Sequence, residues 1–447
     1  MLHKRTGIKN IFLTGLILPI MIFHAGRLDA QTQVRVISVD RAVEMALDEN
    51  LSLKAEKYSL SEKKRSRDTR WNALAPDFTL SSALAKKNEK PVFGDYHWDL
   101  SWQFSAQLAL SASLADGIRY LSRNYEAGLI GYEDAKNQLK RDVKKSFYSL
   151  LVLEESLRLL ENNIKTAEKS YRQAEINYNN GLVSELDKLQ AQVTLESLRP
   201  DYDEALNNYN MSILNFKEMI GLENEEEIKL EGVIEPGLYI IDTNELIFTS
   251  LTERFDIQEL VYQIKLLETD LSSSKNSRLP ALVLGYTKNM LFADDPLKDR
   301  IIGSPEESWT DAGAFSISLS LDIDSLIPGL SKDTEIKNKK DRIRQAESRL
   351  SQALRKADID IRTIVMNIRK SVKKIESLEY NEKLAKRSYE LSSEGYNAGT
   401  VELLKLENSM NQLQAARLKL AEEHYNYQAA LLDLEYAVNK SLEDLNG

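Results

Sequence analysis

The sequence has no cysteine, very little histidine and one long apolar run, and each shortage excludes a class of protein. Without cysteine among its 447 residues, the chain has no disulfide, no thiolate metal site, no cysteine nucleophile and no lipid-modified cysteine. Only four histidines occur, and no paired-histidine metal motif, phosphate loop or nucleophile turn accompanies them. The sequence therefore predicts no enzymatic activity, no metal site and no cofactor.

The one long apolar run lies at the N-terminus and predicts a signal peptide. Basic residues precede the run Ile11 to Phe23, and Ala30 offers a small residue for cleavage before Gln31. A run of 13 residues is shorter than the roughly 20 that a spanning helix needs, which disfavours the alternative of a retained membrane anchor. We expect residues 1–30 to be removed and the mature protein to be exported.

The charge of the mature chain disfavours nucleic acid as a partner. Removal of residues 1–30 leaves 55 basic and 68 acidic residues, a net charge of −13. Phosphate backbones require basic patches, and an acidic balance of this size repels them. Most of these charges are expected on solvated helix surfaces.

One short stretch of sequence occurs twice in similar form. "YNNGLVSELDKL" at 178–189 matches "YNAGTVELLKLE" at 396–407, 218 residues later, and the register continues without a gap over about 50 residues. The chain is therefore interpreted as a duplication, with a first repeat at 31–222, a linker at 223–245 and a second repeat at 246–447.

Each copy of the turn joins two long helical stretches. Apolar residues recur in steps of three and four from about residue 118 onwards and again over 334–396, which is typical of helices that pack lengthwise as coiled coils. The predicted hairpins are 118–220 and 334–440, each closed by a glycine, Gly181 or Gly399, in the left-handed conformation. Pro200 is expected to kink the first return helix.

Each copy also contains a predicted pair of strands. Apolar and polar residues alternate from Leu100 and again over 315–324, and shorter candidates precede them at 77–85 and 281–292. The two predicted strand pairs span 77–114 and 281–324. Within each pair a polar loop, 86–97 or 293–311, joins the two strands, and aromatic residues flank each loop. The pattern predicts four strands with one apolar and one polar face.

Four strands with an exposed apolar face cannot remain an open sheet in water. Helices could cover that face in a soluble α+β domain, but the predicted helices carry narrow apolar stripes that they use on each other. Serine and glutamine on one face, aliphatic residues on the other and aromatics at the ends are typical of a transmembrane barrel wall. The sequence favours a barrel closed by several chains.

In these features the chain resembles the TolC family of outer-membrane efflux channels over nearly its whole mature length. Besides both Tyr-x-x-Gly turns, the resemblance rests on four segments: "VISVDRAVEMALDENLSLKA" (36–55), "LAPDF" (74–78), "SLADGIR" (113–119) and "RLPAL" (278–282). The resemblance implies an α+β membrane protein with long coiled-coil hairpins and four transmembrane strands per chain. Three chains would form a 12-stranded outer-membrane barrel that a 12-helix periplasmic tunnel continues.

The resemblance also assigns roles to the two hairpin tips. Docking of a periplasmic adaptor, or membrane fusion protein, would use Gly181-Leu182-Val183 and Gly399-Thr400-Val401, although both glycines also serve as helix caps. Closure of the tunnel would use a hydrogen bond from Tyr396 on one tip to Asp187 on another, because a hydroxyl donated to a carboxylate is a strong bond. An inner-membrane pump would complete the assembly, and outer-membrane lipid would surround the barrel.

The tips depart from the family pattern at three positions. Val401 replaces an arginine of the lock, and Lys405 and Asn408 replace an acidic pair that lines the constriction. Nearby Glu185, Glu402 and Glu407 are expected to be ordinary solvated charges.

The resemblance leaves the cargo open between drugs, metal ions and proteins. It implies an exit duct for a tripartite efflux or type I secretion system. The competing interpretation is a soluble periplasmic coiled-coil scaffold or adaptor, which the helices alone would allow and the strands disfavour.

Overall fold

The computed structural model describes residues 35–86, 98–234, 237, 239, 241–292, 294, 296, 297, 299, 301 and 305–441. The predicted signal peptide at 1–30 lies outside the described residues, as does the predicted loop 86–97 except for its first residue. Of the predicted loop 293–311, seven residues lie outside them.

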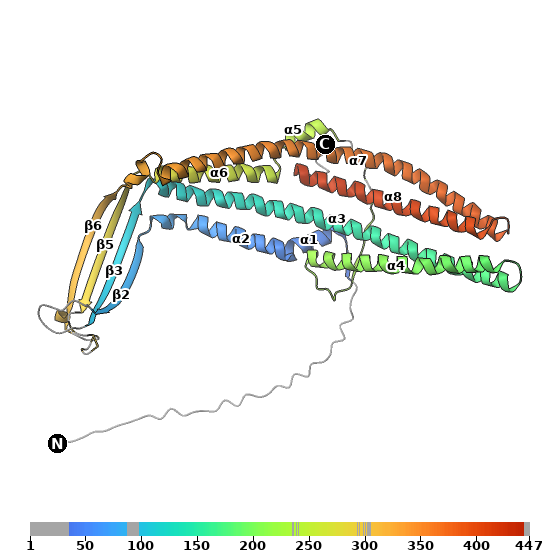
Figure 1. The fold of residues 1–447 in the computed structure, drawn as a ribbon, viewed down its shortest axis with the longest axis horizontal. Helices are drawn as coiled ribbons and strands as arrows, with labels where there is room; N and C mark the ends of the chain where they lie inside the picture. Colours follow the sequence, from blue (N-terminus) through green and yellow to red (C-terminus); the bar gives the residue numbers. More distant parts are fainter. Residues whose placement is uncertain are drawn as a thin grey trace, which may run out of the picture.

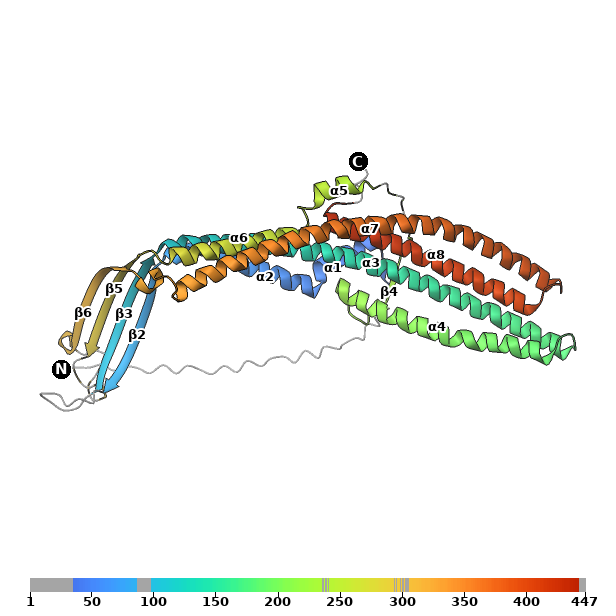
Figure 2. The same cartoon turned by 45° about the horizontal axis from the view of Figure 1, so that its top comes forward.

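Two long helical hairpins form the body of the molecule (Figures 1 and 2). The first consists of α3 (Ala112–Asn179) and α4 (Glu185–Ile220), and the second of α7 (Ser331–Asn397) and α8 (Leu403–Val438). At 1.5 Å per residue, the 68 residues of α3 extend over about 100 Å. Both predicted hairpins are confirmed. The helix α4 continues without a break past Pro200. The kink expected at this proline stays a prediction.

Four shorter helices complete the layer of helices. They are α1 (Val39–Glu49), α2 (Leu51–Asp68), α5 (Thr243–Ser250) and α6 (Phe255–Asn276). The helices α2 and α6 lie beside the halves of α3 and α7 that lead to the sheet, where α4 and α8 are absent (Figure 1). No helix in the described part of the chain is apolar enough over sufficient length to cross a membrane.

A four-stranded antiparallel sheet lies at the end of the molecule opposite the hairpin turns (Figures 1 and 2). Its order is β2 (Asp77–Lys86), β3 (Trp98–Leu110), β5 (Ala281–Phe292) and β6 (Trp309–Ser320). All four predicted strands are present, but the first pair ends at Leu110 and not at the predicted residue 114, because α3 already begins at Ala112. Within this sheet β2 and β6 are the two edges, and each pairs on one side only.

The predicted end of the last strand is wrong. The alternation of apolar and polar residues continues to 324, but β6 ends at Ser320, the partner of Ala281, and a 3₁₀ helix, η3, occupies Ile323–Leu326. The preceding residue, Pro280, has no N–H to extend the ladder, so residues beyond Ser320 have no strand partner. The strand also begins at Trp309, inside the predicted loop 293–311.

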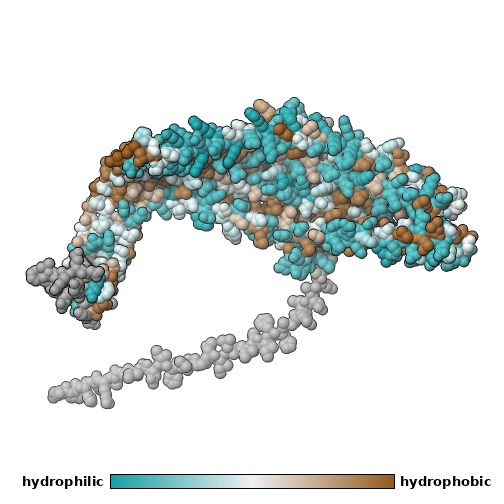
Figure 3. Space-filling view, in the orientation of Figure 1, coloured by the Kyte–Doolittle hydropathy of each residue, from teal (hydrophilic) through white to brown (hydrophobic). Residues whose placement is uncertain are grey.

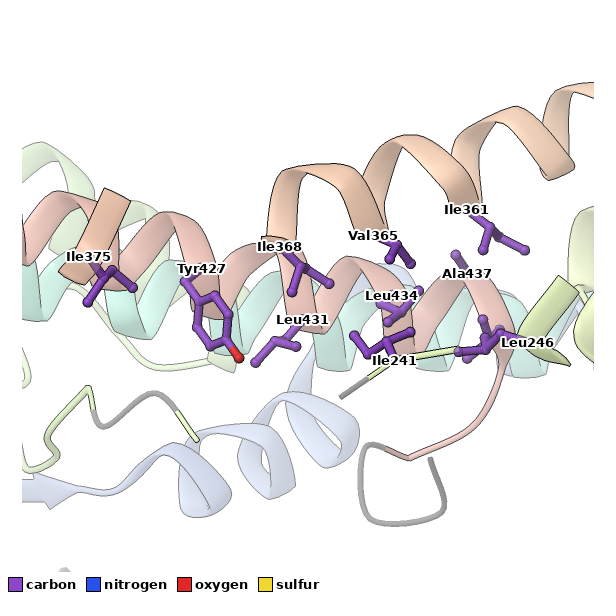
Figure 4. Packing of buried hydrophobic residues seen from close by; sticks show 11 residues of the cluster. Ile241, Leu246, Ile361, Val365, Ile368, Ile375, Tyr427, Leu431, Leu434 and Ala437 are labelled. Carbon is purple, nitrogen blue, oxygen red and sulfur yellow. The ribbon is translucent and has the colours of Figure 1, made fainter. Parts of the chain in front are cut away.

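The best-packed regions lie midway along the rods. In one, Val143, Phe147 and Leu150 of α3 pack against α1 and the end of α4, beside a short parallel pair formed by β1 (Arg35–Ile37) and β4 (Ile228–Leu230). In the other, α7 and α8 pack together and against Ile241 and Leu246 of the linker and α5 (Figure 4). The linker between the two halves therefore belongs to the core.

One tyrosine fastens this linker to α8. Tyr427 is fully buried, and its hydroxyl donates a hydrogen bond of 2.7 Å to the carbonyl of Gly237. The same oxygen accepts a bond of 3.4 Å from the Tyr239 N–H.

Tyr427→Phe should loosen the linker without unfolding the rods. It removes hydrogen bonds worth about 0.5–1.5 kcal/mol each and keeps the packed ring. We expect faster protease cleavage within residues 223–245 than in the wild type, measured by mass spectrometry of the fragments. Tyr425→Phe, at a partly exposed tyrosine two residues away, is the control. Equal cleavage rates in all three proteins would show that the hydroxyl does not hold the linker.

Candidate functional site

The two hairpin tips close with the same backbone motif. In the first, the Leu182 N–H donates to the Asn177 carbonyl at 2.8 Å and the Gly181 N–H to the Tyr178 carbonyl at 2.9 Å. In the second tip, the Thr400 N–H donates to the Gly395 carbonyl at 2.8 Å and the Gly399 N–H to the Tyr396 carbonyl at 3.0 Å. Both motifs need a left-handed residue after the helix, and Gly181 and Gly399 supply it with φ of 69° and 72°. Their predicted role as helix caps is confirmed.

The helices that leave the two tips start differently. At the start of α4 the Asp187 carboxylate accepts bonds from the Ser184 N–H at 3.0 Å and the Ser184 hydroxyl at 2.7 Å. The Ser184 oxygen accepts in turn from the Asp187 N–H at 3.2 Å, which completes a capping box. No side chain caps α8 at Glu402. The second tip is instead tied by the Thr400 hydroxyl, which donates to the Gly395 carbonyl at 3.1 Å.

A groove of about 710 Å³ separates the two tips. The structure brings seven of the eight predicted site residues to its walls: Leu182, Val183, Asp187, Tyr396, Gly399, Thr400 and Val401. Only Gly181 is not part of the lining. Leu182 is 73% exposed, so the first tip presents a large apolar side chain to solvent. The groove thus combines apolar tip residues with two carboxylates, Asp187 and Glu402, and one phenol, Tyr396.

The predicted pair Tyr396 and Asp187 shares this groove. Burial raises the pKa of the Tyr396 phenol, and the negative charges of Glu407 and Asp187 add to the rise. Within the described part of one chain, the Asp187 carboxylate is bonded to Ser184 and not to Tyr396. A bond between the two residues on neighbouring chains therefore stays a prediction.

The expectation that Glu407 is a solvated surface charge is wrong. Glu185 and Glu402 are solvent-exposed as predicted, but Glu407 is only 8% exposed, in the seam between α8 and α4. The Thr194 hydroxyl of α4 donates to its carboxylate at 3.3 Å, and burial raises the pKa of Glu407. The sequence places Glu407 beside the tip but does not say which side of α8 meets the other hairpin.

The other residues near the tips have no partner that suggests chemistry. Lys405 and Asn408, expected from the sequence at a constriction, are both exposed. In the part of the chain that the structure describes, no group of three histidine, aspartate or glutamate side chains could hold a metal ion.

Comparison with known proteins gives a consistent result. The sequence profile of the outer membrane efflux protein family matches residues 42–222 and 246–440. No curated protein sequence matches the chain. Among solved structures, the CmeC outer membrane channel of Campylobacter jejuni is similar with a TM-score of 0.76 and 18% identity, covering 90% of this chain and 85% of that one.

Two further structures share this fold. The outer membrane protein VceC of Vibrio cholerae has a TM-score of 0.71 and 15% identity over 90% of this chain and 96% of its own. The open state of the MtrE outer membrane channel of Neisseria gonorrhoeae has a TM-score of 0.72 and 16% identity, covering 90% of this chain and 89% of its own. At these identities the likeness concerns the fold, with its helical rods and strand pairs.

Glu407→Gln should stabilise the tips at neutral pH. Because burial raises the pKa of this carboxyl, its ionised form opposes folding, by on the order of 1 kcal/mol for a partly compensated buried group. The wild type should gain thermal stability as the pH falls from neutral towards 4.5, the ordinary glutamate value, because Glu407 becomes neutral.

Thermal unfolding in detergent, followed by circular dichroism, measures this dependence. The Glu407→Gln variant should be more stable at neutral pH and lose this part of the pH dependence. Glu402→Gln, at an exposed glutamate, should behave as the wild type. A less stable Glu407→Gln protein at neutral pH would mean that the charge itself is needed.

Proposed function

The chain belongs to the outer membrane efflux protein family, and we propose that it forms a trimeric channel that serves as the exit duct of a tripartite efflux or type I secretion system. Membership in this family makes it an outer-membrane transport protein and not an enzyme. The proposal adds a homotrimer, a periplasmic helical tunnel, and contacts with a periplasmic adaptor and an inner-membrane pump.

The observation that carries the proposal is the uncovered sheet. On its apolar face, Phe315, Ile317 and Leu319 of β6 are 67%, 65% and 72% exposed, and the helices end where the sheet begins (Figures 1 and 2). A soluble scaffold would leave this face in water at a cost of about 25 cal/mol per Å² of apolar surface. Lipid is the solvent in which such a face is stable.

Closure of the sheet requires more than one chain. The edges β2 and β6 each leave one side without a strand partner in the described chain, and open edges are not tolerated in a bilayer. Three copies bring twelve strands and six hairpins around one axis, and the tunnel then continues the barrel. In this arrangement residues 31–222 and 246–447 act as two similar wall segments joined by the linker at 223–245.

The tip groove supports contact with a second protein. Its walls come from both turns of one chain, and the exposed Leu182 and Thr400 stand at corresponding positions of the two turns. We assign adaptor docking to these residues together with Gly181, Val183, Gly399 and Val401. The groove itself selects no cargo class, so drug efflux, metal-ion efflux and protein secretion all fit this duct.

A charge at Leu182 should abolish export while leaving the channel folded. Leu182→Glu changes an exposed tip residue that contributes little to packing. We expect the trimer to form normally and export to be lost because the adaptor no longer engages. Cargo export from cells and trimer migration on gels without heating measure the two effects.

The matched control for docking is Val193→Glu on α4. Val193 is 68% exposed, similar to Leu182, but lies outside the groove. This variant should export as the wild type does. Normal export by Leu182→Glu, or equal losses in both variants, would contradict docking at the tips.

Removing the Tyr396 hydroxyl should make the channel leak. A hydrogen bond to a charged group contributes about 1.5–3 kcal/mol, so three symmetric bonds would hold the closed state by on the order of 4–9 kcal/mol if additive. Asp187 can accept such a bond while it caps α4, because a carboxylate has four acceptor sites. Asp187 is exposed to solvent, and position 401 has valine in place of an arginine, so the free energy that holds the closed state is smaller. We therefore expect partial opening of the channel.

Planar-bilayer recording tests both the channel and its gate. Tyr396→Phe and Asp187→Asn should each raise single-channel conductance, and the double variant should add little. Tyr178→Phe, at the corresponding tyrosine of the first tip, is the control. Additive effects would show that the two residues act separately, and an absence of conductance in the wild type and in every variant would contradict the channel itself.

A further inference from the structure

The two halves of the chain differ where the sheet returns to the helices. Strand β3 passes into α3 through Ser111 alone, whereas ten residues, Leu321 to Leu330, separate β6 from α7. We call this segment the apolar foot. Five of its residues are large, apolar and 38–67% exposed: Leu321, Ile323, Leu326, Ile327 and Leu330.

The apolar foot is a built structure. Ser325 is fully buried, and its N–H and hydroxyl donate to the Asp322 carbonyl at 3.2 Å and 2.5 Å. Further along, Gly329 has a φ of +86°, and its N–H donates to the Asp333 carboxylate at the start of α7 at 3.1 Å. These bonds hold the exposed apolar side chains in place at no further cost in chain entropy.

The foot follows the apolar face of the sheet along the chain. On β6 this face consists of the odd-numbered residues up to Leu319, and the exposed Leu321 and Ile323 follow directly after the strand ends at Ser320. Figure 3 shows hydrophobic surface at the corner where β6 meets α7. Exposed apolar side chains therefore occur both at the end of β6 and on the foot that follows it.

An ion pair fixes how deep the foot lies. Lys288 and Asp311, 2.9 Å apart, interrupt the apolar face, with Asp311 two residues along β6 from Trp309. Exposed charges are costly within the bilayer, and aromatic residues prefer its boundary, so this pair marks the outer limit of the apolar band. From Asp311 to Ser320 the strand rises about 31 Å, or about 24 Å along the membrane normal at a tilt near 40°.

That height equals the apolar band of about 25 Å that outer-membrane barrels present. The inner limit of the band then falls at Ser320, where β6 ends and the foot begins. We propose that the apolar foot is a membrane-surface anchor that inserts its five apolar side chains into the boundary of headgroups and acyl chains of the inner leaflet. The proposal rests on the proposed function, because it requires the sheet to lie in the membrane.

The competing occupant is a second copy of the chain. At the other edge of the sheet, Trp71 and Leu74 of η1 (Arg70–Leu74) are also exposed, at 57% and 42%, and a neighbouring chain could place them on the foot. Lipid is favoured because the foot begins where the apolar band ends, and Leu321 and Ile323, 44% and 67% exposed, directly follow the exposed apolar residues of β6.

Spin labels on single cysteines separate these occupants, because the chain has no native cysteine. The trimer carrying Ile323→Cys is labelled with a nitroxide and reconstituted in phospholipid vesicles, and its collisions with oxygen and with a water-soluble nickel complex are compared. Phe315→Cys reports the apolar band. Ala112→Cys reports the corresponding junction of the first half, which has no foot. Ile327→Cys replaces Ile323→Cys if that protein does not fold.

The proposal expects oxygen to dominate at 323 and 315 and the nickel complex to dominate at 112. Dominance of the nickel complex at 323, with oxygen dominant at 315, would overturn the anchor and leave the membrane barrel intact. An immobile label at 323 that neither reagent reaches would assign the foot to a neighbouring chain and also overturn the proposal. Dominance of the nickel complex at 315 would overturn the proposed function and the anchor with it.

Discussion

The structure depends on one constraint, which is that a sheet with two open edges and an exposed apolar face is unstable in water. The strands β2 and β6 are left without outer partners, and Phe315 and Leu319 face away from every described helix. The proposed solution to both problems is closure of several copies into a barrel surrounded by lipid. The long helices follow from the same constraint, because each strand pair must continue into rods that leave the membrane.

The packing of the long helices determines how the two hairpin tips are positioned. Packing midway along the hairpins, together with the linker pinned by Tyr427, fixes how the two hairpins of one chain lie beside each other. The groove between the tips then has a defined shape although its own contacts are few. The proposed function assigns both closure and adaptor docking to these tips.

Sequence periodicity predicted most of this fold because its elements are long. The alternation in β3 and the repeated turn at Gly181 and Gly399 are local patterns, and both were confirmed. The end of β6 was not predictable in the same way, since it depends on Pro280, the residue that precedes the partner strand β5. The burial of Glu407 depends on which side of α8 meets α4, which a single helix does not reveal.

The most direct measurement of the central claim is the side of the outer membrane on which each end of the molecule lies. Cysteine replaces Asp294, in the loop after β5, or Asn180, at the first tip, and intact cells are treated with an impermeant maleimide. An outer-membrane channel with periplasmic tips predicts labelling at 294 in intact cells and at 180 only after permeabilisation. Labelling at 180 but not at 294 in intact cells would contradict the account.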